Sequence, residues 1–462
     1  MAYTDNPQEQ PQQEAIDSLV TEYQTRGLSR RSFIQRSLAL GLSLSAASTL
    51  LAACGGSSSG NDNPKTLTLL TTWGGEEQDS FKAVVKPFTD RTGIKVTITA
   101  TRDLDAQLTI QIRGKNPPDI AILPNPGKMQ QLASQHNLIA LNDLVDMGAM
   151  QDNYAKSWID LGSYNGKLYA IFFKAANKGT VWYNPAQFQS NNYAVPGTWQ
   201  NMISLSNSIA GQGKYPWSMG VESGAASGWP AADWVAQIFV NQSGPDQYDK
   251  WVAHQIPWTD SSVKNAFQYF GQIAHGQHYI AGAPQSILAT GFTDASYAPF
   301  KSPPTAYMFY LGDFTEGFIT TQFKSLKPET DFNFFPFPTI NDSYKGAITV
   351  GADVVVAMRN NNSVKQLVQY LATADAQAIW VKRGGFTAVN KNVPVSDYPD
   401  PVAQASVTML TSAPIVKYGA GDVMPSQVQN AMWKGLLTYI QSPDQLDSVL
   451  GQIESTAQSA YK

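Results

Sequence analysis

The chain that follows residue 64 changes its hydrophobic period several times, and this alternation restricts the folds open to it. Residues 65–73 alternate Leu and Thr as a strand does, and residues 76–91 repeat apolar side chains at helical spacing. The same change recurs in predicted strands at 94–101 and 119–123 and predicted helices at 103–113 and 128–136. This β-α-β-α-β-α order predicts the α/β class with a mostly parallel sheet.

The rhythm changes after Gly166. Residues 167–173 and 180–183 predict two extended strands joined by a polar, lysine-bearing loop. About 400 residues follow the tether defined below, more than one ordinary core holds, so the two strands suit a hinge between two lobes. Further predicted elements are helices at 198–210, 229–241, 261–275, 364–382 and 443–461 and a strand at 347–357.

An arginine pair precedes an apolar segment that ends in a cysteine. Arg30 and Arg31 stand in an S-R-R-x-F-I context typical of a twin-arginine export signal, although Gln35 stands where lysine is usual and general secretion stays an alternative. Residues 38–53 are too short and too rich in Gly and Ser for a transmembrane helix. The sequence L-A-A-C that ends at Cys54 is similar to a bacterial lipobox, which predicts a lipid on the sulfur; the alternative is a membrane-anchored protein with an inert, buried cysteine.

These features predict a signal at residues 1–54, ending at lipidated Cys54, and a flexible Gly/Ser/Asn/Asp tether at 55–64. The mature chain would then sit on the outer face of the cell membrane, periplasmic or extracellular. Cys54 is the one cysteine of the sequence, so lipidation leaves no thiol for a disulfide, a thiolate metal site or a nucleophile. The net charge is −4 and the sequence has no cluster of Lys and Arg, so we expect no nucleic-acid partner.

Trp73 is a first candidate for ligand contact. It ends the first predicted strand ahead of a helix, and ligands of open α/β sheets bind outside such strand ends. Gly74 and Gly75 allow close backbone approach, but they lack the Gly-Lys-Ser/Thr ending of a phosphate loop. The alternative is an ordinary turn with a half-buried tryptophan.

Trp229 and Asp233 lie one turn apart at the start of a predicted helix. An aromatic face beside a carboxylate suits a sugar, whose C–H face stacks while its hydroxyls need acceptors. The alternative is a core tryptophan with an acid that complements the helix dipole.

Asp353 and Arg383 are further candidates. Asp353 interrupts an apolar strand, so it either lines a cleft or is paired inside the core. Arg383 follows a predicted helix and precedes Gly384 and Gly385, one of which would cap that helix. Arg383 therefore either donates to ligand hydroxyls or neutralises the helix end.

Metal binding and catalysis find little support in the sequence. His275 and His278 have a spacing that allows metal ligation, but Gly276 interrupts the helix and no further ligands cluster nearby. Scattered acids could form a glycosidase pair only if the fold brought two of them face to face; they are Glu222, Asp294, Asp313 and Glu316. We therefore expect no metal, no cofactor and no catalytic residue.

Several short motifs, in their shared order, resemble one family. They are Thr72-Trp73-Gly74, Pro118-Asp119-Ile120, Val181-Trp182-Tyr183-Asn184, the segments 228–234, 248–252, 351–354, 382–386 and 398–401, and Met424-Pro425. Together with the lipobox and tether they are similar to bacterial extracellular solute-binding proteins that serve carbohydrate ABC importers, and more narrowly to the alpha-glucoside-binding branch. The similarity spans residues 65–462.

The resemblance implies a two-lobed periplasmic-binding-protein fold with hinge strands and a ligand cleft between the lobes. The implied N-terminal lobe takes residues 65–175 and about 346–390, and the C-terminal lobe takes 176–345 and about 391–462. In the layout of the maltose-binding protein, Phe314 falls at a sugar-stacking position and Asn177 near a polar sugar contact. The segment 123–126 lacks the aromatic and acidic residues of that layout, which favours a small sugar.

The sequence therefore predicts a non-enzymatic, monomeric sugar receptor that delivers an alpha-linked disaccharide or small oligosaccharide to an importer's permease subunits. The predicted stacking residues are Trp73, Trp229 and Phe314, and the predicted hydrogen-bonding residues are Lys174, Asn177, Asp233, Asp353 and Arg383. A lipoprotein glycosidase or lyase and a binder of an ion such as iron or phosphate are the alternatives.

Overall fold

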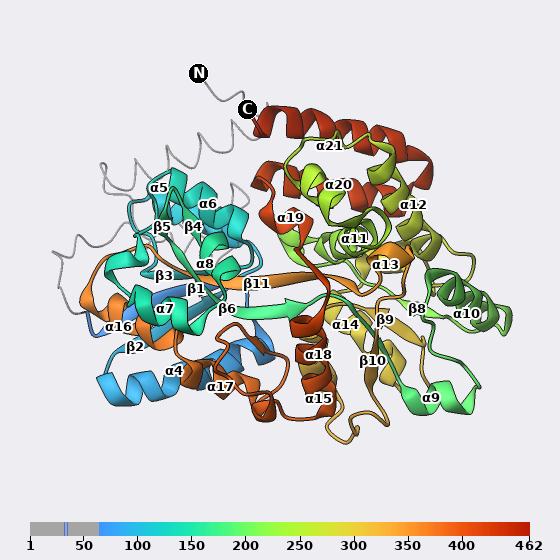
Figure 1. The fold of residues 1–462 in the computed structure, drawn as a ribbon, viewed down its shortest axis with the longest axis horizontal. Helices are drawn as coiled ribbons and strands as arrows, with labels where there is room; N and C mark the ends of the chain where they lie inside the picture. The colour runs from blue at the N-terminus through green and yellow to red at the C-terminus, as the bar shows by residue number, and fades with distance from the viewer. Residues whose placement is uncertain (1–31, 33–34, 36–63) are drawn as a thin grey trace.

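The structure is a computed structural model that describes Ser32, Gln35 and residues 64–462. The predicted export signal, the lipidation at Cys54 and the tether lie outside the described residues, apart from Ser32, Gln35 and Pro64. Figure 1 shows the described body as two lobes side by side, with long strands running between them. This is the two-lobed α/β architecture that the sequence predicts.

A seven-stranded sheet forms the centre of the N-terminal lobe. Its order is β12-β6-β11-β3-β1-β2, with β13 also paired to β11. The strands are β1 (Thr66–Thr71), β2 (Lys95–Ala100), β3 (Ile120–Leu123), β6 (Ala170–Asn177), β11 (Ala347–Ala357), β12 (Thr387–Ala388) and β13 (Ile415–Tyr418). β1 runs parallel to β2 and β3, as the β-α rhythm predicts, but β11 is antiparallel to β3 and β6. The sheet is therefore mixed, because β11 enters it from the other lobe.

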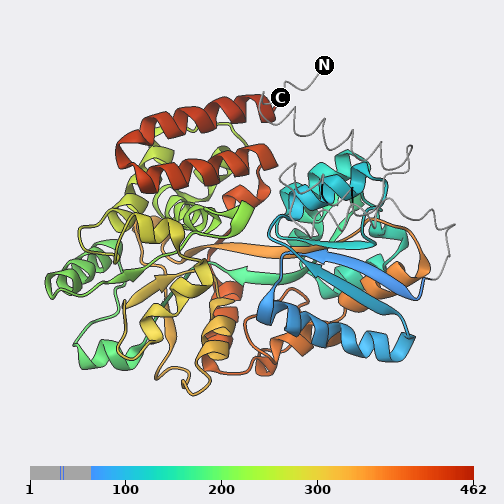
Figure 2. The same cartoon turned by 180° about the vertical axis from the view of Figure 1, so that it is seen from behind.

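Helices cover this sheet on both sides, as Figure 2 shows from behind. They are α4 (Gly75–Thr92), α5 (Leu104–Arg113), α6 (Pro126–Ser134), α7 (Met147–Asn153), α8 (Lys156–Leu161), α16 (Asn362–Leu371) and α17 (Ala374–Val381), with a hairpin of β4 (Ser163–Tyr164) and β5 (Lys167–Leu168). Phe81, Val84 and Phe88 of α4 are fully buried, as their helical spacing predicts. Gly93 ends α4 in the left-handed conformation, with φ of 69°.

The prediction of one helix over residues 364–382 is wrong, because two helices, α16 and α17, occupy this region. Thr373 lies between them in an extended conformation, and its hydroxyl accepts a hydrogen bond from the Ala376 N–H at 3.2 Å. A threonine that caps a new helix competes with continuation of the old one, and apolar periodicity alone does not reveal this.

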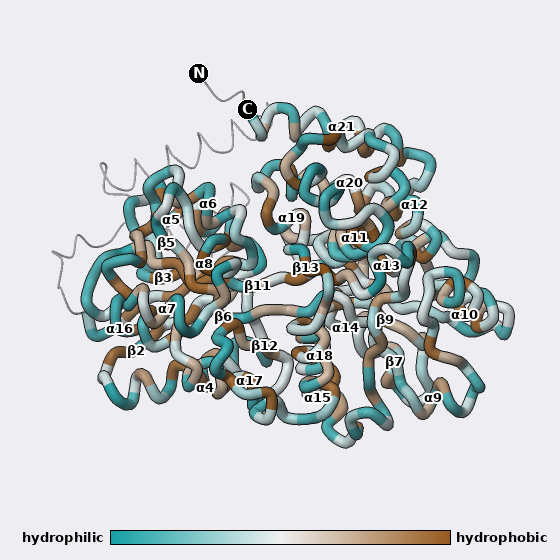
Figure 3. Tube along the Cα trace, viewed as in Figure 1, coloured by the Kyte–Doolittle hydropathy of each residue, from teal (hydrophilic) through white to brown (hydrophobic). Residues whose placement is uncertain are grey.

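The C-terminal lobe is built on a four-stranded sheet of order β10-β7-β9-β8. Its strands are β7 (Thr180–Tyr183), β8 (Trp217–Ser218), β9 (Met308–Tyr310) and β10 (Asn333–Pro336). Its helices are α9 (Pro185–Ser190), α10 (Trp199–Gly211), α11 (Trp229–Val252), α12 (Ser261–Ala274), α13 (Gln285–Ala289), α14 (Phe292–Ser296), α15 (Thr315–Gln322), α20 (Ser426–Gln441) and α21 (Leu446–Ala460). Hydrophobic segments gather where strands and helices face one another in each lobe (Figure 3).

The helix α11 is longer than predicted because a second helical segment continues it after a kink. Gly244 stands at the kink with φ of 80° and ψ of 175°. A Cβ at this position would lie 2.3 Å from the ring of Tyr344. Glycine is therefore required here both by its backbone conformation and by the close approach of the tyrosine.

Three chain segments cross between the lobes. The first is β6, which continues to Asn177 and leads through Lys178 and Gly179 into β7, so the segment predicted as a polar loop is instead buried strand up to Asn177. The second is β11, and the third runs from α18 (Pro401–Ser412) through β13 to α19 (Ala420–Val423). Paired extended strands at the crossing suit hinge motion of two rigid lobes.

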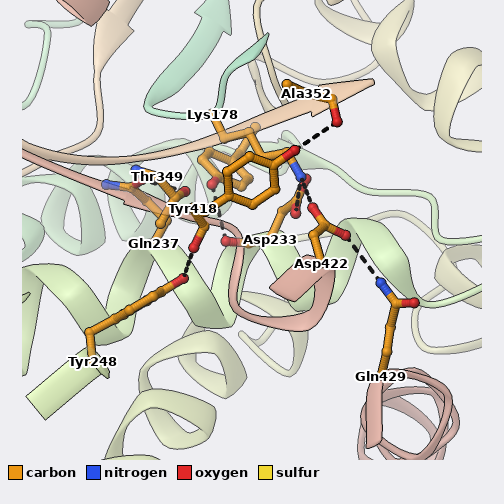
Figure 4. Close-up of polar contacts among 10 residues, drawn as sticks. Lys178, Asp233, Gln237, Tyr248, Thr349, Ala352, Tyr418, Asp422 and Gln429 are labelled. Carbon is orange, nitrogen blue, oxygen red and sulfur yellow. Dashed lines mark hydrogen bonds and ion pairs between the residues drawn. The ribbon is translucent and has the colours of Figure 1, made fainter. Parts of the chain in front are cut away.

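A glutamine of the C-terminal lobe fastens the start of β11. Gln237 on α11 donates to the carbonyl oxygen of Ala347 at 2.9 Å and accepts from the backbone N–H of Thr349 at 2.7 Å. Figure 4 shows Gln237 and Thr349 side by side on facing elements. These bonds fix where the strand leaves the second lobe.

The packing after the boundary predicted near residue 390 involves both lobes. Val393, Tyr398, Val407 and Tyr418 belong to the hydrophobic core of the N-terminal lobe, whereas Ala420 belongs to that of the C-terminal lobe. Val402 of the same segment packs in a cluster with Trp182 and Phe292 of the C-terminal lobe, so residues 393–418 contact both lobes, and the boundary near 390 stays a prediction.

A buried acid lies where α15 of the C-terminal lobe meets the loop after α17. Gly317 and Gly385 pack so closely that a Cβ on Gly317 would lie 3.3 Å from the Cα of Gly385. Glu316, beside them, is 3% exposed, and its Oε1 has no hydrogen-bond partner among the described residues. Burial, together with the carboxylates of Asp400 and Asp313, raises the pKa of Glu316 well above its ordinary value.

The raised pKa of Glu316 gives the stability a defined pH dependence. The folded state keeps a proton that the unfolded state loses near pH 4.5, so stability is full below that pH and falls as the pH rises toward the folded pKa. Glu316→Gln should remove this loss, so that as the pH rises above 4.5 the variant loses up to about 1.4 kcal/mol per pH unit less than the wild type. Denaturant titrations at several pH values measure the difference.

Glu329→Gln, at an exposed position, is the matched control and should behave as the wild type. Parallel pH profiles for wild type and Glu316→Gln would contradict the prediction.

Candidate functional site

A cleft between the lobes holds most of the side chains that the sequence singled out. The N-terminal lobe and hinge contribute Trp73, Glu77, Arg102, Asn125, Lys174, Lys178 and Asp353, and the C-terminal lobe contributes Trp229, Asp233, Phe292, Phe314, Asp422, Gln429 and Trp433. The cleft opens beyond the carboxyl ends of β1 and β3, where open α/β sheets bind their ligands.

Lys178 joins two carboxylates on separate elements of the C-terminal lobe. It directly follows β6, and its ammonium donates to Asp233 Oδ1 on α11 at 2.7 Å and to Asp422 Oδ2 on α19 at 3.2 Å (Figure 4). Gln429 on α20 holds the other oxygen of Asp422 at 3.1 Å. A Cβ at Gly351 would lie 2.6 Å from Lys178 Cε, so the glycine leaves the lysine its path along β11.

The charges of this group depend on one another. Burial by itself lowers the pKa of Lys178, but the carboxylates of Asp233 and Asp422 outweigh it, so the net shift is upward and the ammonium stays charged. Burial raises the pKa of Asp233, and Lys178 counteracts that rise. Asp233 is 6% exposed, and its Oδ2 has no hydrogen-bond partner among the described residues. A buried acceptor without a partner is costly, so a donor that enters the cleft here is favoured.

A second acid–lysine group lies on the N-terminal side of the cleft. Lys174 on β6 forms an ion pair with Glu77 on α4, and its ammonium lies 5.5 Å from the ring centre of Phe314. Trp73 donates its indole N–H to Asp353 Oδ2 at 3.2 Å. The sequence left open whether Asp353 lines a cleft or is paired inside the core. In the structure it lines the cleft and is also paired, with Trp73.

The pKa of Asp353 lies close to neutrality. Burial is the main cause and the carboxylate of Glu77 adds to it, while Lys174 and the indole N–H of Trp73 act in the opposite direction; the result is a pKa of about 7. This carboxyl group can therefore accept a hydrogen bond, or donate one when protonated, near neutral pH.

The aromatic wall of the cleft consists of Trp229, Phe292 and Phe314. Trp229 and Phe314 are half-buried, with ring centres 6.2 Å apart, and Phe292 meets Trp229 edge-on at 5.0 Å. Trp229 and Phe314 thus lie where we expected stacking residues.

Trp73 differs from the expectation of a stacking face. It lines the cleft, but it is only 2% exposed, and the edges of Phe81 and Trp380 pack against it at 5.2 and 4.9 Å. In the cleft it donates the hydrogen bond that orients Asp353, and the ammonium of Lys174 lies 5.8 Å from its ring centre.

The structure places the remaining two predicted contacts outside the residues that line the cleft. Asn177 is fully buried in the hinge, where its amide donates to the Ser406 carbonyl at 3.2 Å and accepts from the Gly179 N–H at 2.9 Å. Arg383 donates to Ser80 at 2.9 Å and to Glu76 at 3.2 Å, so it braces α17 against α4. Both are structural contacts in this conformation rather than cleft donors.

Sequence reasoning missed several cleft residues, above all Lys178 and Asp422. Lys178 was seen only as part of a polar connection, although its position in a hinge is itself a signal. Asp422 follows a Gly-Ala-Gly run between a strand and a helix, a pattern typical of a ligand-side loop. Arg102, Phe292 and Gln429 carry no comparable local signal.

Within residues 64–462, no group of three or more His, Cys, Asp or Glu side chains is arranged to hold a metal ion. His275 contacts the carbonyl oxygen of Tyr439 at 3.1 Å, while His278 stacks near Tyr215. The two histidines of the H-G-Q-H tract therefore have separate partners. In the same described part of the chain, no helix combines the length and the apolarity needed to span a membrane.

Comparison with known proteins defines the family. Residues 74–378 match the bacterial extracellular solute-binding protein family. The osmoprotective compounds-binding protein GgtB of Synechocystis sp. is 32% identical over 86% of this chain and 93% of its own length. The alpha-glucosides-binding periplasmic protein AglE of Rhizobium meliloti is 31% identical over 84% of this chain and 86% of its own. The chain therefore belongs to the bacterial extracellular solute-binding proteins, as the sequence motifs predicted.

Solved structures agree on the fold. The bacterial solute receptor AcbH superposes with a TM-score of 0.76 at 21% identity, covering 86% of this chain and 99% of the receptor. A chitin oligosaccharide binding protein gives 0.74 at 18% identity, covering 87% of this chain and 100% of its own. These superpositions show that the chain shares its two-lobed fold with both proteins.

The buried ion group predicts a large effect of removing its cation. Lys178→Met should destabilise the folded chain by roughly 3–5 kcal/mol, because it leaves two carboxylates without their buried partner. Denaturant unfolding at neutral pH measures the loss.

Lys86→Met is the matched control, since the Lys86–Asp90 pair is exposed and such pairs contribute about 0–1 kcal/mol. Equal stability of the two variants would refute the role assigned to Lys178.

Proposed function

We propose that this chain is the sugar receptor of an ABC importer and that it binds an alpha-glucoside disaccharide or small oligosaccharide in the cleft between its lobes. The observation that carries the proposal is a buried carboxylate, Asp233, whose Oδ2 lacks a partner and which lies one helical turn from the half-buried ring of Trp229. Both groups face the same cleft.

A sugar matches this pair chemically. Its C–H face stacks on an aromatic ring while its hydroxyls donate to carboxylate oxygens. Lys178 and Lys174 are already neutralised by acids of the protein, and among the described residues Arg102 is the one cation of the cleft without an acid partner. A single exposed guanidinium is not the cationic cradle that phosphate needs. This favours a neutral hydroxyl-rich ligand over an anion.

The ligand class is supported by the relatives. GgtB is named for osmoprotective compounds and AglE for alpha-glucosides, and both align over most of this chain. The segment at Pro124 and Asn125 brings no aromatic or acidic side chain into the cleft, which favours a short ligand. Asp233, Asp353 and Lys174 would bond to its hydroxyls, and Trp229 and Phe314 would stack on its rings.

Closure of the lobes on the sugar is the proposed signal to the permease subunits. A ligand shifts the equilibrium between open and closed lobes only if it binds the closed form more tightly than the open one. A cleft lined from both lobes provides this difference in affinity, because a closed cleft contacts the ligand from both sides. We further propose that the receptor acts as a monomer without catalysis, anchored through lipidated Cys54 on the outer face of the membrane.

Calorimetric titration of the purified full chain in detergent with trehalose, sucrose, maltose, palatinose and glucose tests the proposal, with the sugar recovered and analysed afterwards. Tight one-to-one binding of an alpha-glucoside that is recovered intact is the expected result. Hydrolysed sugar would instead indicate a glycoside-active lipoprotein. No heat with any of these sugars would refute the alpha-glucoside assignment.

Loss of the stacking ring should weaken binding. Trp229→Ala should raise the Kd of the sugar by roughly 10- to 100-fold, because it removes an aromatic face from the cleft. Titration calorimetry measures the change, and Trp229→Phe should recover part of the affinity. Trp158→Ala, which removes a half-buried tryptophan outside the cleft, is the control and should keep the wild-type Kd. An unchanged Kd for Trp229→Ala would make Trp229 a packing residue only.

The lipid anchor has its own test. Full-length wild-type protein expressed in a bacterial host should partition into the detergent phase of a temperature-induced phase separation, whereas Cys54→Ser should move to the aqueous phase. An unchanged partition of the variant would argue against the lipid and for the alternative of an uncleaved anchor.

A further inference from the structure

Arg102 of the N-terminal lobe reaches across the mouth of the cleft. It lies in the connection between β2 and α5, and its guanidinium carbon is 5.1 Å from the ring centre of Phe292 on α14 of the C-terminal lobe. Both residues line the cleft. Arg102 is exposed, whereas Phe292 is 7% exposed. The contact thus joins the two lobes across the cleft.

A second segment of the C-terminal lobe also approaches Arg102. A Cβ on Gly224 would lie 3.4 Å from the Cβ of Arg102, which is ordinary van der Waals contact. Gly224 begins the turn Gly224–Ala226, which precedes Trp229 and α11. Arg102 therefore lies against two segments of the opposite lobe, the Gly224–Ala226 turn and α14.

Arg102 differs from the other cations of the cleft in its partners. Lys174 and Lys178 each form an ion pair with a buried or half-buried acid. In the described part of the chain, the side chain of Arg102 forms no ion pair and no hydrogen bond, and its one specific contact is the ring of Phe292. Nothing in its own lobe holds the guanidinium there, so the contact with the second lobe accounts for its position.

Phe292 connects this contact to the ligand wall. Its ring meets Trp229 edge-on at 5.0 Å with an interplanar angle of 70°. We propose that Arg102 holds the cleft closed over bound sugar by stacking on Phe292, and that it thereby determines how long the sugar stays bound. The inference rests on the proposed sugar-binding function.

The physical basis is a contact between side chains of different lobes, which opening of the cleft would break. An exposed cation–π pair favours the state that contains it by about two- to fivefold. Because the partners lie on different lobes, a movement that opens the cleft would separate them. Its loss should therefore raise the release rate and leave the association rate unchanged.

Stopped-flow tryptophan fluorescence of the full chain, with the sugar that titrates most tightly, tests the proposal. Arg102→Met should release sugar about two- to fivefold faster than the wild type. Phe292→Leu removes the ring that Arg102 contacts, so it should abolish the slowing of sugar release that Arg102 provides. In the Phe292→Leu background, Arg102→Met should have no further effect on release. Arg91→Met is the matched control, because Arg91 lies 5.5 Å over the ring of Tyr370 within one lobe and should not affect release.

Two kinetic outcomes would overturn the inference. A release rate unchanged by Arg102→Met would remove the role of the residue in closure. An equal effect of Arg102→Met with and without Phe292 would mean that Arg102 contacts the sugar itself. Failure of the wild type to bind any sugar is different, since it would refute the proposed function.

A measurement without sugar tests the Arg102 contact even if the wild type binds none of the sugars. Spin labels on cysteines introduced at the exposed positions Thr109 on α5 and Gln285 on α13, in a Cys54→Ser background, report the separation of the lobes. Arg102→Met should move the distance distribution toward longer separations. Identical distributions in the variant and the wild type would overturn the inference independently of the ligand.

Discussion

The ion group of Lys178, Asp233 and Asp422 is the interaction on which the arrangement of hinge and cleft depends. Its three members come from the end of β6, from α11 and from α19, and the ammonium lies within 2.7 and 3.2 Å of the two acids. Buried charges of this kind are stable only together, because each desolvated charge is compensated by its neighbours. The group therefore fixes how the crossing strand meets the second lobe, and it sets the polar floor of the cleft at the same position.

This arrangement explains why the cleft suits a neutral ligand. The protein's own acids neutralise both buried lysines, and what stays available is a carboxylate oxygen of Asp233, the near-neutral carboxyl of Asp353 and the faces of Trp229 and Phe314. Fixed ion pairs hold these acceptors in place before ligand arrives, so little ordering is needed on binding. The Arg102–Phe292 contact joins the two lobes beside these groups, where we propose that it acts on closure.

Much of the fold follows from local pattern. The strand over 347–357 is as predicted, and Phe81 and Phe88 are buried as the helical spacing of residues 76–91 indicates, because each reflects the period of buried positions along one short segment. The errors have local causes that periodicity does not register. Thr373 starts a new helix, Gly244 lets α11 turn and continue, and a polar stretch around Lys174 becomes buried strand because its charges find partners in other elements.

The sequence by itself determined the β-α order, the two-lobed class and six side chains that the structure brings together in the cleft; these are Trp73, Lys174, Trp229, Asp233, Phe314 and Asp353. Tertiary structure alone decided that Asn177 and Arg383 serve the hinge and a helix contact, and that Lys178 and Asp422 complete the polar group. The reason is distance along the chain: Lys178 meets Asp233 from 55 residues away and Asp422 from 244. Local sequence reports whether a position is buried, whereas the partner of a buried charge is set by how remote segments fold against one another.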